Sequence, residues 1–181
     1  GVYNDADQGI IGCGQPTFNW GWNNTFNYKN FDFSFFVVGF HGFDIYNATH
    51  QMGYNLIKSQ QMAGVTPMRE LLNRWTPTNT NTDIPGFVKG GTENKDFFST
   101  RFVENGSFIK MKSITLGYTL PEATCRSLGI NNLRVYASVQ NPFHITKYSG
   151  LDPEATMGSP LVQGVDWGAY PNSRNYLIGL N

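Results

Sequence analysis

Charge is scarce in this sequence of 181 residues: Asp, Glu, Lys and Arg make up only 14% of it, against a usual share of about 25%. The 13 basic and 13 acidic residues give a formal net charge of zero, and the basic ones form no cluster along the chain. A nucleic-acid-binding surface or a polybasic lipid anchor needs such a cluster. We therefore expect no nucleic acid among the partners.

Long apolar runs are also missing. Mean hydropathy is −0.34, and no stretch approaches the roughly 18–20 apolar residues of a membrane helix. Patterns for catalysis are equally scarce, because His41, His50 and His144 lack metal-ligand spacing and no nucleophile-elbow motif surrounds Ser107. We predict that the chain is not an enzyme and that it holds no cofactor.

Calcium is the one ion that the sequence leaves open. Asp152, Glu154 and Asp166 fall in one predicted loop, and Ca²⁺ favours sites rich in carboxylates. No motif of fixed spacing joins them, however, and Asp152-Pro153 is more simply a turn. The prediction is no metal site, with calcium as the alternative.

Aromatic residues, in contrast, make up 15% of the chain and alternate with polar residues near its start. The even-numbered positions of this stretch, apart from Asn24, are all aromatic: Phe18, Trp20, Trp22, Phe26 and Tyr28. A strict period of two is typical of a β-strand with one apolar and one polar face. Ten steps of ~3.3 Å, tilted by ~40°, rise about 25 Å, which is the height of the apolar band on an outer-membrane barrel. We therefore predict a transmembrane strand with aromatic side chains toward lipid and amides toward a wet lumen.

The next residues fit a second strand of the same kind. Lys29-Asn30 can form a two-residue turn, since Asn tolerates positive φ, and this turn places Tyr28 opposite Phe31. The apolar residues of both strands then share one side. Three residues interrupt the polar side toward the far end of the second strand: Phe36, Val38 and Phe40. We expect that end to pack against another part of the protein.

Along the whole chain we predict five antiparallel strands, at residues 17–28, 31–45, 97–120, 132–141 and 175–180. Their connections alternate between short and long: Lys29-Asn30, Tyr46–Asp96, Pro121–Asn131 and Pro142–Pro171. Bacterial barrels have short periplasmic turns and long extracellular loops, so the two long loops are predicted to be extracellular. This topology puts Cys13 and Cys125 on opposite sides of the membrane, and we expect both to be unpaired.

Two local features refine this prediction. In the third strand the alternation changes phase near Lys112, which either a β-bulge or emergence of the strand above the membrane would explain. The loop 46–96 carries one helical signal, with Thr66 as cap, Pro67 in the first turn and Pro77 at the end. Its apolar residues have helical spacing and should pack on the loop itself: Met68, Leu71, Leu72 and Trp75.

The alternation assigns the following residues to the lipid-facing side: Phe18, Trp20, Trp22, Phe26, Tyr28, Phe31, Phe33, Phe35, Val37, Ile114, Leu116, Tyr118, Leu133, Val135, Ala137, Val139, Tyr176, Ile178 and Leu180. It assigns these polar residues to the inner side: Asn19, Asn23, Asn27, Asp32 and Arg134. Loop aromatics are candidates for contact with a substrate or a lid protein: Tyr54, Trp75, Phe87, Tyr148, Trp167 and Tyr170. We expect most of these six to hold the long loops together instead.

Several segments carry a family resemblance: Tyr28–Phe33 (YKNFDF), Gly39–Asn47 (GFHGFDIYN), Phe102–Pro121 (FVENGSFIKMKSITLGYTLP), Leu133–Glu154 (LRVYASVQNPFHITKYSGLDPE) and Asp166–Leu180. In order and spacing they resemble the C-terminal part of SusC/RagA-type TonB-dependent outer-membrane transporters. The resemblance covers nearly the whole chain. It implies the last five strands of a 22-stranded barrel, with residues 1–181 as one barrel segment.

The resemblance also implies a function and partners. Such transporters import oligosaccharides, or in some members peptides, across the outer membrane of Bacteroidetes. A SusD-like surface lipoprotein acts as a lid, and TonB supplies energy through an N-terminal plug domain. The chain has no initiator Met or signal peptide, no plug or TonB-contacting segment, and no terminal aromatic residue after Asn181. We therefore expect it to be a piece of a longer protein, bordered by the rest of its own barrel and plug and by outer-membrane lipid.

Two other classes of protein remain open at this stage. A soluble carbohydrate-binding β-sandwich would use its aromatic residues to bind glycans or to fill a core. A surface protein without transport activity would share the barrel strands alone. Neither the cargo nor the oligomeric state follows from the sequence.

Overall fold

The computed structural model describes residues 8–54, 67–86, 99–155 and 163–181. One antiparallel sheet contains, in spatial order, β1 (Phe18–Tyr28), β2 (Phe31–His41), β5 (Phe108–Thr119), β6 (Arg134–Gln140) and β9 (Asn175–Leu180), and β7 (His144–Thr146) also pairs with β5. A smaller sheet has the order β4 (Val103–Asn105), β3 (Asp44–Asn47) and β8 (Val165–Asp166). The helices are α1 (Ala48–Tyr54) and α3 (Glu122–Ser127), with 3₁₀ turns η2 (Arg69–Asn73) and η3 (Thr100–Phe102).

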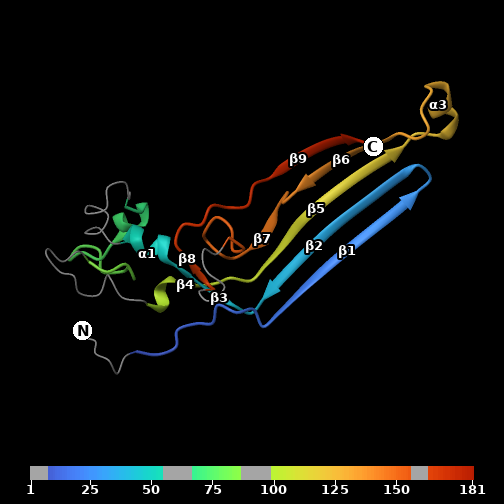
Figure 1. Cartoon of the computed structure of the whole chain (residues 1–181). Helices are drawn as coiled ribbons and strands as arrows, with labels where there is room; N and C mark the ends of the chain where they lie inside the picture. Colours follow the sequence, from blue (N-terminus) through green and yellow to red (C-terminus); the bar gives the residue numbers. More distant parts are fainter. Residues whose placement is uncertain (1–7, 55–66, 87–98, 156–162) are drawn as a thin grey trace.

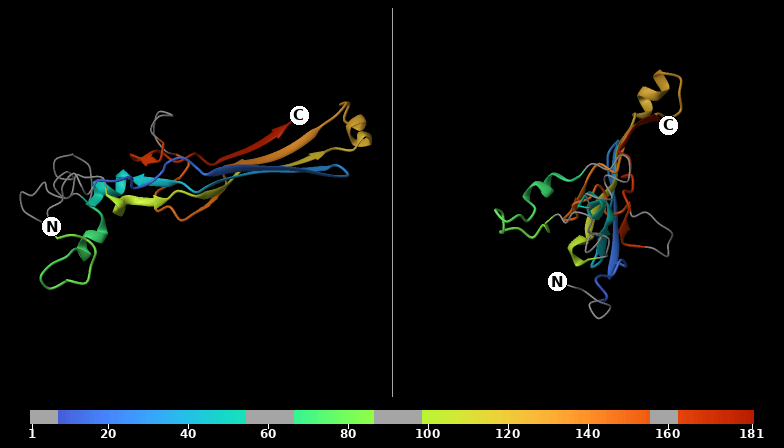
Figure 2. Two further views of the ribbon diagram at one scale, coloured as in Figure 1. Left: turned by 90° about the horizontal axis from the view of Figure 1, so that it is seen from below. Right: turned by 90° about the vertical axis from the view of Figure 1, so that its left-hand side faces the viewer.

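The molecule is elongated, and its two ends differ (Figures 1 and 2). The long strands run together as a twisted sheet, with α3 near one end. The smaller sheet, α1 and the 3₁₀ turns gather at the other end. We call this second region, formed by residues 42–54, 67–86, 99–107 and 147–174 where they are described, the loop cluster.

The predicted hairpin register is confirmed. Tyr28 pairs with Phe31 and Trp22 with Val37, as a two-residue turn requires. The residue with positive φ is Lys29, at 52°, rather than Asn30. Asn30 instead binds the neighbouring strand, because its Nδ2 donates to the Thr119 carbonyl at 2.8 Å.

A β-bulge explains the change of phase in the third strand. Phe36 pairs with Ser113, but Val37 pairs with Met111, so Lys112 is left without a partner residue on β2. The bulge turns Lys110 toward the polar face of the sheet. Of the two explanations that the sequence left open, the structure shows the bulge.

Two predicted strands are each divided in two, which corrects the predicted bounds. The stretch 31–45 breaks after His41, where Gly42 adopts φ 74°, and β3 then joins the smaller sheet. The third predicted strand contains the 3₁₀ turn η3 near its start and breaks between Asn105 and Phe108. At this break Gly106 lies so close to Phe43 that a Cβ there would be 2.4 Å from the ring. These close approaches are tertiary contacts, which strand alternation does not encode.

The helix prediction was wrong in its details. The described residues 67–77 form only the 3₁₀ turn η2, in which Leu71 is buried while Leu72 is 78% exposed. Thr66 lies outside the described residues. Helix α1 was not predicted from the sequence. It begins after Asn47, and the side-chain oxygen of Asn47 accepts the His50 N–H at 2.9 Å.

Within residues 8–54, 67–86, 99–155 and 163–181, no helix combines the length and apolarity required to cross a membrane.

The buried core lies where the sheet enters the loop cluster. One group of side chains contains Val38, Phe43, Ile45, Phe108 and Tyr148, with Phe40 packed against it. A second group contains Tyr46, Ala48 and Phe102. The expected packing at the far end of β2 is thus confirmed for Val38 and Phe40, whereas Phe36 remains 36% exposed.

Candidate functional site

One face of the long sheet is apolar and exposed. Cross-strand pairing aligns the residues assigned to the lipid-facing side, from β1 through β2, β5 and β6 to β9, on a single face. Trp22 is 56% exposed and Ile178 is 85% exposed. Aromatic rings on this face pack against one another across the strands; for example, the ring centroids of Trp22 and Phe35 are 5.3 Å apart. Leu133 precedes β6 and lies outside this pairing.

The opposite face carries a forked ion pair near the hairpin turn. Arg134 Nε donates to Asp32 Oδ1 at 2.9 Å, and Arg134 Nη2 donates to Asp32 Oδ2 at 2.5 Å. The pair bridges β2 and β6 across Gly117 of β5, where a Cβ would lie 2.4 Å from Asp32 and 2.5 Å from Arg134. A glycine at this position therefore lets the two side chains meet. The sheet thus has one largely apolar face, on which Asn24 Nδ2 has no hydrogen-bond partner among the described residues, and an opposite face on which Asp32 and Arg134 satisfy each other.

A lysine–carboxylate cluster joins the sheet to the loop cluster; it consists of Lys110, Lys112, Asp152 and Glu154. Lys110 Nζ donates to Asp152 Oδ2 and lies 2.7 Å from Glu154 Oε2 as well, and its side chain is 2% exposed. Lys112 pairs with the other oxygen of Glu154. The Asn172 backbone N–H also donates to Asp152 Oδ2, at 3.2 Å. Three chain segments therefore meet at two carboxylates.

The electrostatics of this cluster favour the charged carboxylates. Burial by itself raises the pKa of Asp152, but Lys110 and two backbone N–H donors outweigh it and hold that pKa below its ordinary value. Burial likewise raises the pKa of Glu154, but Lys110 and Lys112 lower it by more, so the pKa of Glu154 lies below its ordinary value. Two of the three carboxylates considered for calcium, Asp152 and Glu154, are thus already paired with lysines.

The third carboxylate, Asp166, is also engaged. Tyr148 Oη donates to Asp166 Oδ2 at 2.5 Å, and the backbone N–H groups of Gly168 and Ala169 donate to its Oδ1 at 2.8 and 3.0 Å. Burial, followed by the hydrogen bond to this carboxylate, raises the pKa of Tyr148. In the described part of the chain, no three His, Cys, Asp or Glu side chains gather in a way that fits a metal ion.

The six loop aromatics have different environments. Tyr148 is only 5% exposed and belongs to the core, so it cannot contact a substrate or lid unless the loop cluster opens. Tyr54 packs against Phe102, with ring centroids 6.0 Å apart. Phe87 lies outside the described residues. Trp75, Trp167 and Tyr170 are 46%, 51% and 90% exposed, and their contact with a substrate or lid stays a prediction.

Neither ion-pair system was predicted from the sequence. Asp32 and Arg134 are 102 residues apart, and Lys110 and Asp152 are 42 apart. The available signal was the spacing of like charges, with Lys110 two residues from Lys112 and Asp152 two residues from Glu154. Charge alone does not specify a partner.

Comparison with known proteins shows which proteins this chain resembles. No protein-family model matches the chain. TonB-dependent receptor P3 of Formosa agariphila is 37% identical over 187 aligned residues, which cover 100% of this chain and 18% of that protein. TonB-dependent receptor SusC of Bacteroides thetaiotaomicron is 33% identical, over 89% of this chain and 14% of that protein. Over its whole length the chain is similar to TonB-dependent receptors, among them SusC.

Solved structures agree. The RagAB peptide importer in its closed-closed state superposes with a TM-score of 0.74 and 27% identity, over 92% of this chain and 17% of that one. In the open-open state the TM-score is 0.72. These matches confirm the predicted antiparallel barrel portion, and TonB-dependent receptors are outer-membrane proteins rather than enzymes. The chain spans less than a fifth of the length of the relatives it matches.

Proposed function

We propose that residues 1–181 form part of the wall and the extracellular loops of a TonB-dependent importer, as the C-terminal segment of its 22-stranded barrel. The observation that carries this proposal is the exposed hydrocarbon face, extended over five strands and backed by a polar face. A soluble β-sandwich would cover that face with a second sheet, and no second sheet covers it in the described part of the chain.

The cargo that fits best is an oligosaccharide or a peptide taken up from the cell surface. The name SusC and the RagAB peptide importer support this class of cargo. Exposed loop aromatics such as Trp167 and Tyr170 suit sugar stacking or packing against a lid. The partners in this proposal are a SusD-like lipoprotein over the loops, TonB acting through an N-terminal plug domain, and outer-membrane lipid.

Growth tests this function. A strain that lacks the complete receptor gene is expected to lose growth on one glycan or peptide of a defined panel, and the intact gene should restore it. A variant lacking the exposed ring of Trp167 (Trp167→Ala) should weaken uptake more than Leu72→Ala, a change at an apolar loop residue that is even more exposed. Unchanged growth of the deletion strain on every member of the panel would contradict the proposal.

Thiol labelling tests the orientation of the loops. Cys13 is exposed beside the loop cluster, where its carbonyl accepts the Asp44 N–H at 2.8 Å. Cys125 is buried in α3, so its failure to react would not report its side of the membrane. We therefore place the second reporter at exposed Ala123 of the same helix, as Ala123→Cys in a Cys125→Ala background. An impermeant reagent on intact cells should label Cys13 and spare the reporter; the opposite result reverses the proposed orientation.

A further inference from the structure

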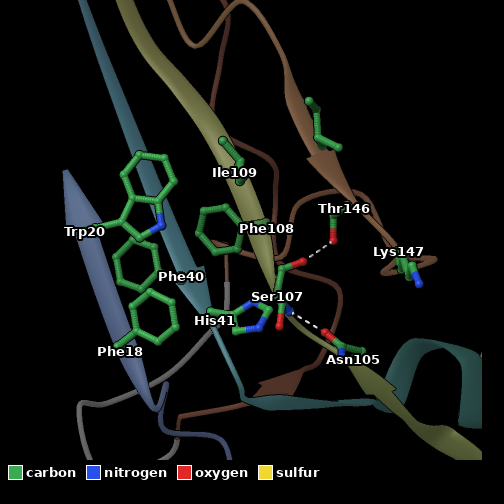
Figure 3. Close-up of a pocket in the computed structure, with 11 residues that line it drawn as sticks. Phe18, Trp20, Phe40, His41, Asn105, Ser107, Phe108, Ile109, Thr146 and Lys147 are labelled. Atoms are coloured by element: carbon green, nitrogen blue, oxygen red, sulfur yellow. Dashed lines mark hydrogen bonds between the residues drawn. The ribbon is translucent and has the colours of Figure 1, made fainter. Parts of the chain in front are cut away.

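A groove crosses the apolar face at the end nearest the loop cluster (Figure 3). Its volume is about 380 Å³, within the range of roughly 300–1,000 Å³ that is usual for ligand sites. One row of paired residues runs through it across four strands: Trp20 pairs with Gly39, Gly39 with Ile109, and Ile109 with Ile145. Paired residues share a face of the sheet, so the groove opens on the hydrocarbon side.

Gly39 gives Trp20, a residue that lines the groove, room to lie flat against the sheet. The Trp20 indole lies across this glycine so closely that a Cβ at Gly39 would be 2.3 Å from the ring. The apolar lining of the groove comes from Trp20, Ile109 and Ile145, together with the rings of Phe18, Phe40 and Phe108. Ile109 and Ile145 are 43% and 63% exposed, so they leave hydrocarbon surface open along the groove.

The polar lining lies at the other end of the groove. His41 stands two residues beyond Gly39 on β2 and therefore on the same face of the sheet. Lys147 follows the last residue of β7 directly, and both side chains line the groove near the loop cluster (Figure 3). No carboxylate lines the groove. Among the described residues, Lys147 has no ion-pair partner.

We propose that this groove binds a single anionic membrane lipid, with one acyl chain between Trp20 and Ile145 and the anionic head group at Lys147. The argument rests on the proposed function, which makes this face lipid-facing and the loop-cluster end extracellular. A bilayer lipid is then oriented correctly, because its tail lies toward the middle of the sheet and its head group toward the loops. A water-soluble cargo would instead meet the polar face of the sheet.

The chain offers matched controls for both ends of the groove. Ile145→Trp fills the apolar end, and Ile178→Trp places the same bulk on the same face at β9, away from the groove. Lys147→Glu reverses the charge at the polar end, and Lys29→Glu reverses an exposed lysine in the hairpin turn. Tryptophan is compatible with lipid contact, so both Trp variants should fold.

Native mass spectrometry of the complete receptor in mild detergent measures the bound lipid. The probes are lipid A, which is the anionic lipid of the outer-membrane leaflet at the extracellular loops, dephosphorylated lipid A with the same acyl chains, and water-soluble glucosamine 1-phosphate. We expect one retained lipid A, and retention about tenfold weaker in Ile145→Trp and in Lys147→Glu, a change equivalent to about 1.4 kcal/mol for each. Ile178→Trp and Lys29→Glu should retain the lipid as the unaltered receptor does.

Three results would overturn the proposal. Equal retention of both lipids, or equal loss in the variants and their controls, would mean ordinary annular lipid. Binding of the head group alone as well as the whole lipid would mean a free-anion site. Failure of the proposed function is seen separately, in the growth of the deletion strain, because lipid retention is measured on purified receptor.

Discussion

The long sheet and the loop cluster treat their apolar side chains in opposite ways. The sheet displays them, with Phe26 55% and Ile178 85% exposed, whereas the cluster encloses Ile45 and Ala48 completely. Polar groups differ as well, since Asp152 of the cluster is buried against Lys110 of β5, while β1 keeps most of its Asn and Thr side chains exposed. The cluster therefore has a buried core like that of a water-soluble domain, and the sheet has the exposed apolar surface expected of a protein in lipid.

The largest expected effect comes from removing the sheet from its surroundings. In the described sheet, β1 and β9 each have one unpaired edge, and in lipid each unsatisfied backbone group costs several kcal/mol. Residues 1–181 expressed alone should therefore aggregate or stay unfolded when mixed with vesicles. Circular dichroism and protease protection would show this, and a cooperatively folding fragment would contradict it.

A change where the sheet meets the loop cluster comes next. Lys110→Met leaves Asp152 buried without its ammonium partner and should destabilise the complete receptor by about 3–5 kcal/mol. Lys112→Met is the control, because Lys112 is 28% exposed and its loss should cost no more than about 1 kcal/mol. Urea unfolding in detergent micelles measures both changes. Equal effects of the two variants would show that burial does not set the strength of this cluster.

On the sheet, two adjacent residues test the two faces directly. Trp22→Arg puts a charge on the hydrocarbon face near the middle of β1 and should cost about 2–4 kcal/mol in a bilayer. Asn23→Arg puts the same charge on the opposite face and should cost little. Unfolding titrations in lipid vesicles would measure the difference. Similar costs at both positions would remove the distinction between a lipid face and a lumen face.

The smallest effect is the pH dependence of the loop cluster. The pKa values of Asp152 and Glu154 are lowered on folding from their ordinary values of 3.8 and 4.5, so the unfolded chain binds protons more readily. Their stabilisation is complete above the ordinary values and disappears as the pH falls through the lower, folded values. The urea midpoint of the receptor should therefore drop in acid, and Lys110→Met should flatten that slope. A slope unchanged by Lys110→Met would separate the pH dependence from the lysine–carboxylate cluster.

The division also separates what could be predicted from what could not. The hairpin from Phe18 to His41 was predicted residue by residue, because alternation and a two-residue turn fix a register locally. The loop cluster was not, since β8 and α1 depend on contacts with distant segments. Tyr46 of β3 pairs with Val165 of β8, 119 positions along the sequence. Of the six loop aromatics, Tyr148 is the one that is buried in the core, and no periodic pattern in the sequence predicted its burial.

By itself the sequence determined the class of the protein: period-two alternation of large aromatics, low charge and alternating loop lengths admit few structures other than a membrane barrel. The tertiary structure decided how the sheet ends. The bulge at Lys112 turns Lys110 from the lipid-facing phase to the polar face, where Asp152 and Glu154 neutralise it. The pairing of β1 with β2 brings Gly39 beneath Trp20, and the pairing of β2 with β5 and of β5 with β7 adds Ile109 and Ile145 to the groove. Both features require side chains from segments far apart in the chain, such as Lys110 with Asp152 and Trp20 with Ile145, which come together only in the folded protein.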